Sequence, residues 1–292
     1  MPESPEVQAL AEELGARLSG RALSAVDVIE FRILKSRARQ PSSLIGARVS
    51  AVARHGKLVD LVFESSEHLV VSLGRHGWAR WAGAEVAEAE PSTEPSTAPG
   101  EAPVALASLE FDDGSVLELT DAGSWVSLGC WVVDDASDVP AVAKLGPDPA
   151  DPAFDRAQFD AAFVGRRKQL KAVLQDQESL AGIGNAYSDE ILFAAKLSPV
   201  VHASALSSDE LDRLFQATVG VITGAIQAQR GVLIARLKQA KVDAMQVHGR
   251  AGEACPVCGD TIRDFSFAST TAQYCPTDQT HGELLPLRAA GS

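Results

Sequence analysis

The sequence predicts an α+β fold of several domains: a β-rich N-terminal domain opened by a helix, a helical middle, and a small cysteine-containing module at the C-terminus. Three observations predict it. Apolar residues recur at helical spacing near the N-terminus, strand-like segments follow as far as residue 133, and helical periodicity returns beyond residue 155. With 292 residues, 46% of them apolar and 22% charged, the chain is long enough for two domains or one large one.

The N-terminal part is predicted to be a helix over residues 5–19 followed by an antiparallel sandwich or barrel. The helix has an apolar stripe formed by Val7, Leu10, Leu14 and Leu18. Short β-type segments then alternate with glycines and polar clusters, including the hairpin turn Asp112-Asp113-Gly114. The expected strands cover residues 26–31, 47–53, 58–63, 68–73, 106–111, 116–120 and 125–133.

Two composition changes predict the domain boundaries. Residues 88–103 are rich in Pro, Ser, Thr and Glu and cannot form a core, so we expect residues 82–104 to be a disordered insertion between two strands. The Gly- and Pro-containing stretch 145–149 precedes a helical part. The expected helices cover about 156–176, 186–196, 208–228 and 231–240. The expected domains are therefore 1–135, 136–250 and 251–292.

The net charge of −13 is unevenly distributed along the chain. Residues 82–104 carry five acids and no base, whereas residues 161–250 carry eleven Lys or Arg and eight acids. Local patches matter more than the total for binding phosphate, so the charge does not exclude a nucleic acid as the partner. The sequence contains no apolar run of membrane-spanning length and no signal peptide, so we expect a cytoplasmic protein without membrane contact.

The C-terminal cysteines have the spacing of zinc ligands. Cys255 and Cys258 form a C-x-x-C knuckle, and Cys275 begins a second knuckle whose last position is Asp278. A carboxylate is a zinc ligand, and His281 is a second candidate for the fourth position. The alternative is a degenerate finger that folds without metal. We expect a structural Zn²⁺ because three thiolates remain at the right spacing, and we expect Cys130 to be a core thiol.

The N-terminus carries residues that can act chemically. Removal of Met1 makes Pro2 the terminal residue, and a free α-amine has a pKa near 8, so its neutral form can attack a sugar C1′. Glu3 lies beside it and can act as a general acid or base. Many unrelated chains begin Met-Pro, so this start alone does not indicate catalysis.

Two further motifs are typical of phosphate contacts. RHGK at residues 54–57 places Lys57 at the start of a strand, where an exposed turn lysine is the simpler explanation. The glycines at 182 and 184 and then Asn185 lead into a helix whose N-terminus can bind an anion, with Asn185 both capping the helix and donating to phosphate. A glycine turn with Asn185 as the N-cap and no phosphate explains them equally well. The basic residues at 166–168 and Lys171 are expected on one helix, as a solvated face or a phosphate track.

Together these motifs, in this order, resemble the formamidopyrimidine-DNA glycosylase/endonuclease VIII family of bifunctional glycosylase/AP lyases. The resemblance rests on the PE-x-PEV start, RHGK, LGPDP, the C-x2-C-x16-C spacing and above all the block LKAVLQDQESLAGIGNAYSDEILFAAKLSP at 170–199. It covers nearly the whole chain, with residues 82–104 as an insertion. It implies an N-terminal helix on an antiparallel β-sandwich, a helix–two-turn–helix domain and a zinc-finger hairpin.

The resemblance also implies roles for individual residues. Pro2 corresponds to the Schiff-base nucleophile, Glu3 to the acid that assists base loss, and Glu6 to the family's second N-terminal glutamate. Lys57 corresponds to the hairpin lysine that contacts DNA near the lesion, with Arg54 beside it. In the family, an Asn at the position of Asn185 binds phosphates that flank a nucleotide flipped out of the duplex.

This chain departs from the family where DNA is held open. Arg75 stands in place of the intercalating Met of LGMSG, and Trp125 in place of the Phe of DPRRFG, whose two arginines are lost. Thr270 stands in place of an Arg that binds phosphates at the lesion. We expect Arg75 and Trp125 to contact DNA. Residues 229–247 also lack the family's Gly-Ser-Thr-rich loop that caps oxidised purines, which makes a role on 8-oxoguanine doubtful.

The sequence therefore predicts a monomeric DNA glycosylase/AP lyase that acts on double-stranded DNA containing oxidised or ring-opened bases or abasic sites, in the cytoplasm with the nucleoid. The alternative is a protein that binds damaged or abasic DNA with weak or no catalysis. The retained N-terminal residues favour the enzyme, and the lost arginines favour the binding protein.

Overall fold

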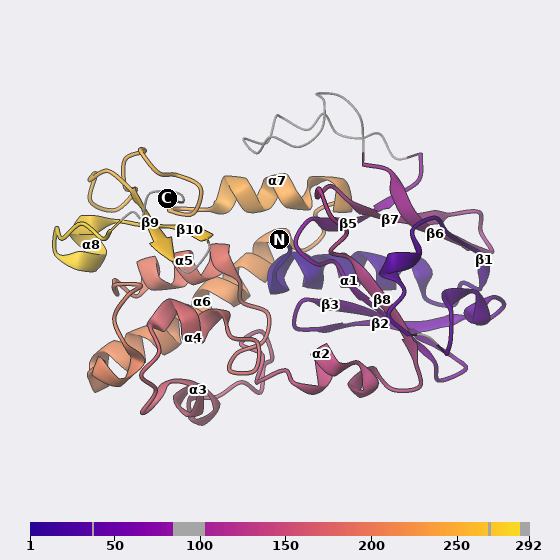
Figure 1. Cartoon of the computed structure of the whole chain (residues 1–292), viewed down its shortest axis with the longest axis horizontal. Coiled ribbons are helices and arrows are strands. Elements are labelled where there is room, and N and C mark those ends of the chain that lie inside the picture. Colours follow the sequence, from indigo (N-terminus) through magenta and orange to yellow (C-terminus); the bar gives the residue numbers. More distant parts are fainter. Residues whose placement is uncertain (37, 84–102, 268–269, 287–292) are drawn as a thin grey trace. The chain divides into compact units, whose positions relative to one another are not determined.

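The structure is a computed structural model that describes the chain except residues 37, 84–102, 268–269 and 287–292. The chain folds into two compact units (Figure 1). Unit 1 comprises residues 1–144 and 229–238, and unit 2 comprises residues 145–228 and 239–292. None of the helices within the described residues combines the length and apolarity needed to cross a membrane.

Unit 1 is a helix packed with two antiparallel four-stranded sheets. The sheets have the strand orders β1-β6-β7-β5 and β2-β3-β4-β8, and their inner faces share one apolar core with α1. The elements are α1 (Ser4–Leu18), β1 (Leu23–Val28), β2 (Val49–His55), β3 (Leu58–Phe63), β4 (His68–Ser72), β5 (Gly77–Trp81), β6 (Ala105–Phe111), β7 (Val116–Asp121), β8 (Gly129–Val133) and α2 (Pro140–Ala143). The predicted helix and sandwich are confirmed.

Helix α1 begins and packs as its sequence dictates. Glu3 and Glu6 form a reciprocal capping box, and Pro5 occupies the first turn, where its missing N–H costs nothing. The residues of the predicted apolar stripe, Val7, Leu10, Leu14 and Leu18, are all at most 1% exposed in the core. The helix ends before Gly20, whose φ of +78° is the left-handed conformation that glycine adopts readily.

Unit 2 is mainly helical and ends in a small two-stranded hairpin. A core of apolar side chains from α3 to α6 holds the helices together, and β9 pairs with β10 in an antiparallel register. The elements are α3 (Arg156–Phe163), α4 (Leu170–Gln175), α5 (Asn185–Ala194), α6 (Ser208–Gln229), α7 (Ile234–Ala244), β9 (Arg263–Phe267), β10 (Thr270–Tyr274) and α8 (Pro276–Thr280). The last residue of α6 and the first turn of α7 belong to unit 1.

Three expectations about the elements are wrong. The helix expected over 156–176 is two helices, because the chain turns at Gly165 with a φ of +74°. Strand β5 is not among the strands predicted from the sequence. Its five residues do not alternate between buried and exposed positions, because the neighbours Trp78 and Ala79 are both buried. The strand expected over 125–133 begins only at Gly129. The predicted insertion at 82–104 falls mostly outside the described residues, between β5 and β6.

Candidate active site

The first turn of α1 gathers the predicted N-terminal residues in a buried position. Pro2 is buried immediately before the helix, and Glu3 and Glu6 are each 1% exposed. The backbone N–H of Glu3 donates to Glu6 Oε2 at 3.0 Å. Burying carboxylates is costly unless they are hydrogen-bonded, so this arrangement is held by specific contacts. It places two carboxyl groups within four residues of the N-terminal proline.

Lys57 lies in the turn between β2 and β3, as expected. Arg54 links this turn to α1, because its Nε donates to Gln8 Oε1 at 2.8 Å and its Nη1 donates to the carbonyl of Gly56 at 2.8 Å. The Arg54 side chain therefore holds the lysine turn and α1 together, in addition to the DNA contact predicted for it.

A buried carboxylate supports the same hairpin from the strand side. Asp60 on β3 is 1% exposed, and its Oδ2 lies 3.0 Å from Nε2 of His55 and 2.9 Å from Nδ1 of His68. His55 is the second residue of the RHGK motif, directly before the turn. Sequence reasoning missed Asp60, because its partners come from two strands and their pairing is visible only in the sheet.

The Arg75 turn and the Trp125 loop lie side by side in unit 1. The backbone N–H of Arg75 donates to Ser127 Oγ at 2.9 Å, and both Arg75 and Trp125 are exposed. Asp121 fixes the loop, since its carboxylate accepts from the amides of Gly123, Ser127 and Leu128. Burial alone would raise the pKa of Asp121, but these hydrogen bonds outweigh it and lower the pKa.

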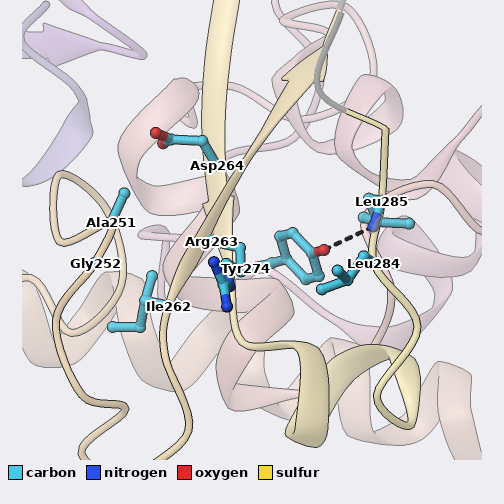
Figure 2. Close-up of a pocket in the computed structure, with 8 residues that line it drawn as sticks. All are labelled: Ala251, Gly252, Ile262, Arg263, Asp264, Tyr274, Leu284 and Leu285. Carbon is cyan, nitrogen blue, oxygen red and sulfur yellow. Dashed lines mark hydrogen bonds between the residues drawn. The ribbon is translucent and has the colours of Figure 1, made fainter.

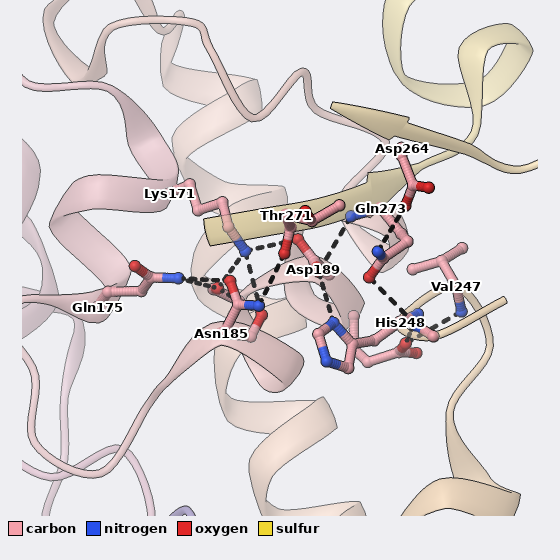
Figure 3. A network of polar contacts seen from close by, with 12 residues as sticks. Lys171, Gln175, Asn185, Asp189, Val247, His248, Asp264, Thr271 and Gln273 are labelled. Carbon is pink, nitrogen blue, oxygen red and sulfur yellow. Dashed lines mark hydrogen bonds and ion pairs between the residues drawn. The ribbon is translucent and has the colours of Figure 1, made fainter. Parts of the chain in front are cut away.

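The second candidate phosphate site is the start of α5. The N-cap is Gly184, and Asn185 is the first helical residue, so the expectation that Asn185 caps the helix is wrong. Its side chain is bonded elsewhere: Nδ2 donates to the Thr271 carbonyl at 3.1 Å, and Oδ1 accepts from Gln175 Nε2 at 3.2 Å (Figure 3). These contacts orient the Asn185 amide with its oxygen toward Gln175 of α4 and its nitrogen toward Thr271 of β10.

A buried ionic network lies behind Asn185 (Figure 3). Lys171 and Asp189 have fully buried side chains whose Nζ and Oδ1 are 2.5 Å apart. Lys171 also donates to Ser188 Oγ at 2.8 Å, and Asp189 Oδ2 lies 2.7 Å from Nδ1 of His248. Lys171 is therefore structural and not part of an exposed basic face. Residues 166–168 lie between α3 and α4, so the expectation of one basic helix is wrong.

The next residue on α5 ties the helix to the chain that leads into the hairpin. Glu190 accepts hydrogen bonds from the backbone amides of Gln246, Val247 and His248 at 2.9–3.0 Å. Burial raises the pKa of Glu190, although these three hydrogen bonds oppose the shift. Together with Asp189, it fixes the start of the C-terminal module on α5.

The cysteine module brings four metal-ligand atoms together. Cys255, Cys258, Cys275 and Asp278 each offer one, and all four atoms lie within 4.8 Å of one another. Cys255 Sγ lies 3.3 Å from Asp278 Oδ2, and the sulfurs of Cys258 and Cys275 are 3.4 Å apart. Three thiolates and a carboxylate are a donor set that fits a structural zinc ion. His281 is not part of this cluster within the described residues, so it is Asp278 that offers the fourth ligand atom.

A pocket lies on the hairpin of the C-terminal module. Its volume is about 410 Å³, and Tyr274, whose hydroxyl accepts a hydrogen bond from the N–H of Leu285 at 2.7 Å, forms one wall (Figure 2). Arg263 and Asp264 line it as well, but no residue predicted from the sequence does. The candidate chemistry is therefore associated with α1, the loops of unit 1 and the start of α5.

Family models match most of the chain. The formamidopyrimidine-DNA glycosylase N-terminal domain model matches residues 1–125, and the formamidopyrimidine-DNA glycosylase H2TH domain model matches residues 145–236. A formamidopyrimidine-DNA glycosylase of Mycolicibacterium gilvum is 32% identical over 96% of this chain and 98% of its own length. A formamidopyrimidine-DNA glycosylase-like protein of Mycobacterium tuberculosis, described as uncharacterized, is 44% identical over 50% of this chain and 91% of its own.

Solved structures show the same fold. The Lactococcus lactis Fpg (MutM) in complex with a FAPY-dG-containing DNA has a TM-score of 0.81 at 23% identity, with 95% of this chain and 100% of that chain covered. The Lactococcus lactis Fpg bound non-covalently to DNA containing an AP site has a TM-score of 0.79 at 23% identity, with 95% and 99% covered.

Proposed function

Because the chain belongs to the formamidopyrimidine-DNA glycosylase family, we propose that it is a bifunctional DNA glycosylase and AP lyase that acts through Pro2. The observation that carries this proposal is the first turn of α1, where Pro2 is buried together with the carboxyl groups of Glu3 and Glu6. Base excision by an amine needs a nucleophile and an acid in one place, and this turn supplies both.

The proposed reaction begins at the sugar. The neutral amine of Pro2 attacks C1′ of the damaged nucleotide, and the base leaves with the electron pair of its bond to C1′ and takes up the proton that the amine nitrogen loses. Glu3 then supplies a proton to O4′ of the ribose. The sugar ring opens to give an iminium between C1′ and the proline nitrogen. Loss of a C2′ proton then expels the 3′ phosphate, and a second elimination expels the 5′ phosphate. Water finally hydrolyses the iminium and restores the amine.

The proposed DNA contacts come from both units. Lys57 and Arg54 would contact the backbone near the lesion, and Asn185 would bind phosphate at the start of α5, where the helix N-terminus favours an anion. Arg75 and Trp125 lie on adjacent exposed loops, which supports a role in filling the gap that a flipped nucleotide leaves. We further propose that the protein acts as a monomer in the cytoplasm, on duplexes with oxidised or ring-opened bases or abasic sites.

The zinc ion has a structural role in this proposal. Cys255, Cys258, Cys275 and Asp278 would hold it, and it would stabilise the module that carries β9 and β10. This module includes Thr271, whose carbonyl accepts the hydrogen bond from Asn185.

A second candidate function is binding of damaged or abasic DNA with little catalysis. The observation that favours it is the replacement of DNA-contacting arginines: residues 122–124 read Ala-Gly-Ser, and position 270 is a threonine. The loss of these arginines weakens the binding of DNA phosphates, whereas the residues of α1 are unchanged.

Borohydride trapping on a duplex with one abasic site separates the two functions. We expect the wild type to form a covalent adduct that Pro2→Gly abolishes and Glu3→Gln retains in part. Binding of the same duplex without any wild-type adduct would reject the enzyme and support the binding protein.

A further inference from the structure

A segment far from the N-terminus in sequence contacts α1 in unit 1. Residues 229–237 run from the last residue of α6 into the first turn of α7, and Ile234 and Leu237 anchor them in the core at 2% and 0% exposure. The Nε1 of Trp78 donates to the carbonyl of Ile234 at 3.2 Å, and the N–H of Ile234 donates to Glu13 Oε2 at 2.8 Å. The segment is thus held against α1 and the sheet by several independent contacts.

Gln229 makes the contact that matters for the candidate active site. It is 3% exposed, and its Nε2 donates to Glu6 Oε1 at 3.0 Å. The other oxygen of this carboxylate, Oε2, accepts from the backbone N–H of Glu3. Each oxygen of Glu6 therefore has a separate donor, one from the capping box and one from a residue 223 positions away.

The neighbouring residue provides a contrast within the same segment. Arg230 is about half exposed and forms a fork with Glu12, with Nε and Nη2 each 3.0 Å from one carboxylate oxygen. The hydrogen bond from Arg230 lowers the pKa of Glu12. This pair also joins the segment to α1, but Glu12 lies six residues beyond Glu6, more than one and a half helical turns farther along α1.

We propose that Gln229 is a positioning residue for the N-terminal nucleophile. By fixing the Glu6 carboxylate, Gln229 holds the acceptor for the Glu3 amide, and this amide determines the direction in which Pro2 leaves the helix. The inference rests on the proposed function of Pro2 and adds a residue that acts through the Glu6 carboxylate. A buried carboxylate that loses one of two donors shifts toward another arrangement, since an unsatisfied buried acceptor is costly.

The test compares Gln229→Leu with Arg230→Gln under single-turnover conditions on an abasic duplex. We expect Gln229→Leu to lower the rate at saturation about tenfold with the half-saturating protein concentration changed less than twofold, which is the size expected for one buried hydrogen bond. We expect Arg230→Gln to stay within about twofold of the wild type in both quantities. A loss in half-saturation alone would assign Gln229 to binding and overturn the inference.

Equal losses in the two variants would also overturn it, because docking of the whole segment and not the Gln229 bond would then be responsible. Thermal unfolding of both variants shows that each is folded before the rates are compared.

A second measurement keeps the inference testable if the wild type forms no adduct and the proposed function fails. Hydrogen exchange of the Glu3 amide is followed by NMR in the three proteins. We expect exchange about tenfold faster in Gln229→Leu and unchanged in Arg230→Gln. An unchanged rate in Gln229→Leu would overturn the inference independently of catalysis.

Discussion

At the start of α1, the side chains of Glu3 and Glu6 each accept a hydrogen bond from the backbone amide of the other residue. At the start of α5, by contrast, the side-chain amide of Asn185 and the buried Lys171 of α4 bond to several separate segments. Glu3 and Glu6 need only the helix itself to meet. Asn185 depends on Gln175 of α4 and on Thr271 of β10. The capping box of α1 is local, and Gln229 donates to it from far along the chain.

This difference explains which parts of the family's apparatus the chain has kept. The proline, the acid and the capping box all lie within the first six residues, so they are retained wherever that short stretch of sequence is retained. The proposed phosphate-binding site at the start of α5 relies on a distant hairpin, in which the arginine expected at 270 and the fourth cysteine are replaced. Substitutions can therefore change the proposed chemistry at α1 and the proposed DNA binding at α5 separately, and the following predictions test this.

The largest expected effect is the loss of lyase rate in acid. Pro2 reacts only as the neutral amine, and a terminal α-amine has a pKa near 8, so we expect the single-turnover rate to fall about tenfold for each pH unit below it. From pH 8 to pH 5 this amounts to roughly a thousandfold. The rate is measured on an abasic duplex at saturating protein.

Glu3→Gln serves as the matched variant for this profile. It should lower the maximal rate at high pH but leave the pH at which the rate begins to fall unchanged, because that fall reflects protonation of the Pro2 amine. A wild-type rate that stays flat over the same range would exclude Pro2 as the nucleophile.

The next effect lies at α5. Lys171→Met leaves the Asp189 carboxylate buried without its cation, and breaking a buried pair in this way costs about 3–5 kcal/mol. Lys168→Met is the control, since its pair with Asp176 is exposed and contributes at most about 1 kcal/mol. Urea unfolding of both variants gives the free energies. Similar losses in both would mean that the buried network does not hold the start of α5.

The same contrast shows what sequence reasoning can reach. Pro2 and Glu3 are predicted from the chemistry of the N-terminus and Glu6 from the resemblance, and the structure joins the two glutamates by a capping box between positions three apart. The zinc cluster is predictable because each knuckle is a short pattern. The sequence groups Lys171 with a basic cluster, although it is fully buried. Its partners Ser188 and Asp189 lie in another helix, and no local pattern indicates which lysine will meet them.

Two further misses have the same cause. The sequence predicts that Asn185 caps α5, but its side-chain amide is hydrogen-bonded to Gln175 and Thr271. The N-cap is Gly184, which has no side chain to cap the helix. The lysine that touches DNA in the family is expected from the motif at 54–57, but the support from Asp60 below it appears only when three strands are paired.

A smaller effect is expected at the metal cluster. Asp278→Asn removes the carboxylate charge but keeps the shape of the side chain, and we expect zinc affinity to fall about tenfold or more because the amide is a poorer ligand. His281→Ala should bind zinc as the wild type does. Competition with a chromophoric chelator measures both. Weaker binding in His281→Ala alone would make His281 the fourth ligand.

The smallest effect tests the loop that carries Trp125. Asp121→Asn loses the charge-assisted hydrogen bonds from the amides of the loop, which we expect to cost about 1–2 kcal/mol of unfolding free energy because the site is only partly buried. Since these bonds lower the pKa of Asp121 in the folded chain, its contribution is complete above the unfolded pKa of about 4. It is then lost as the pH falls through the lower folded pKa.

The difference between wild type and Asp121→Asn should therefore be constant from pH 5 to pH 7 and shrink below pH 4. Urea unfolding at several pH values measures it. Trapping of the abasic duplex should change less than the excision of a damaged base, since an abasic site has no base left to extrude and the void-filling loop matters less there. A variant that lost both activities equally would show that Asp121 supports the chemistry at α1 and not only the loop, and the separation between chemistry and grip would then fail inside unit 1 itself.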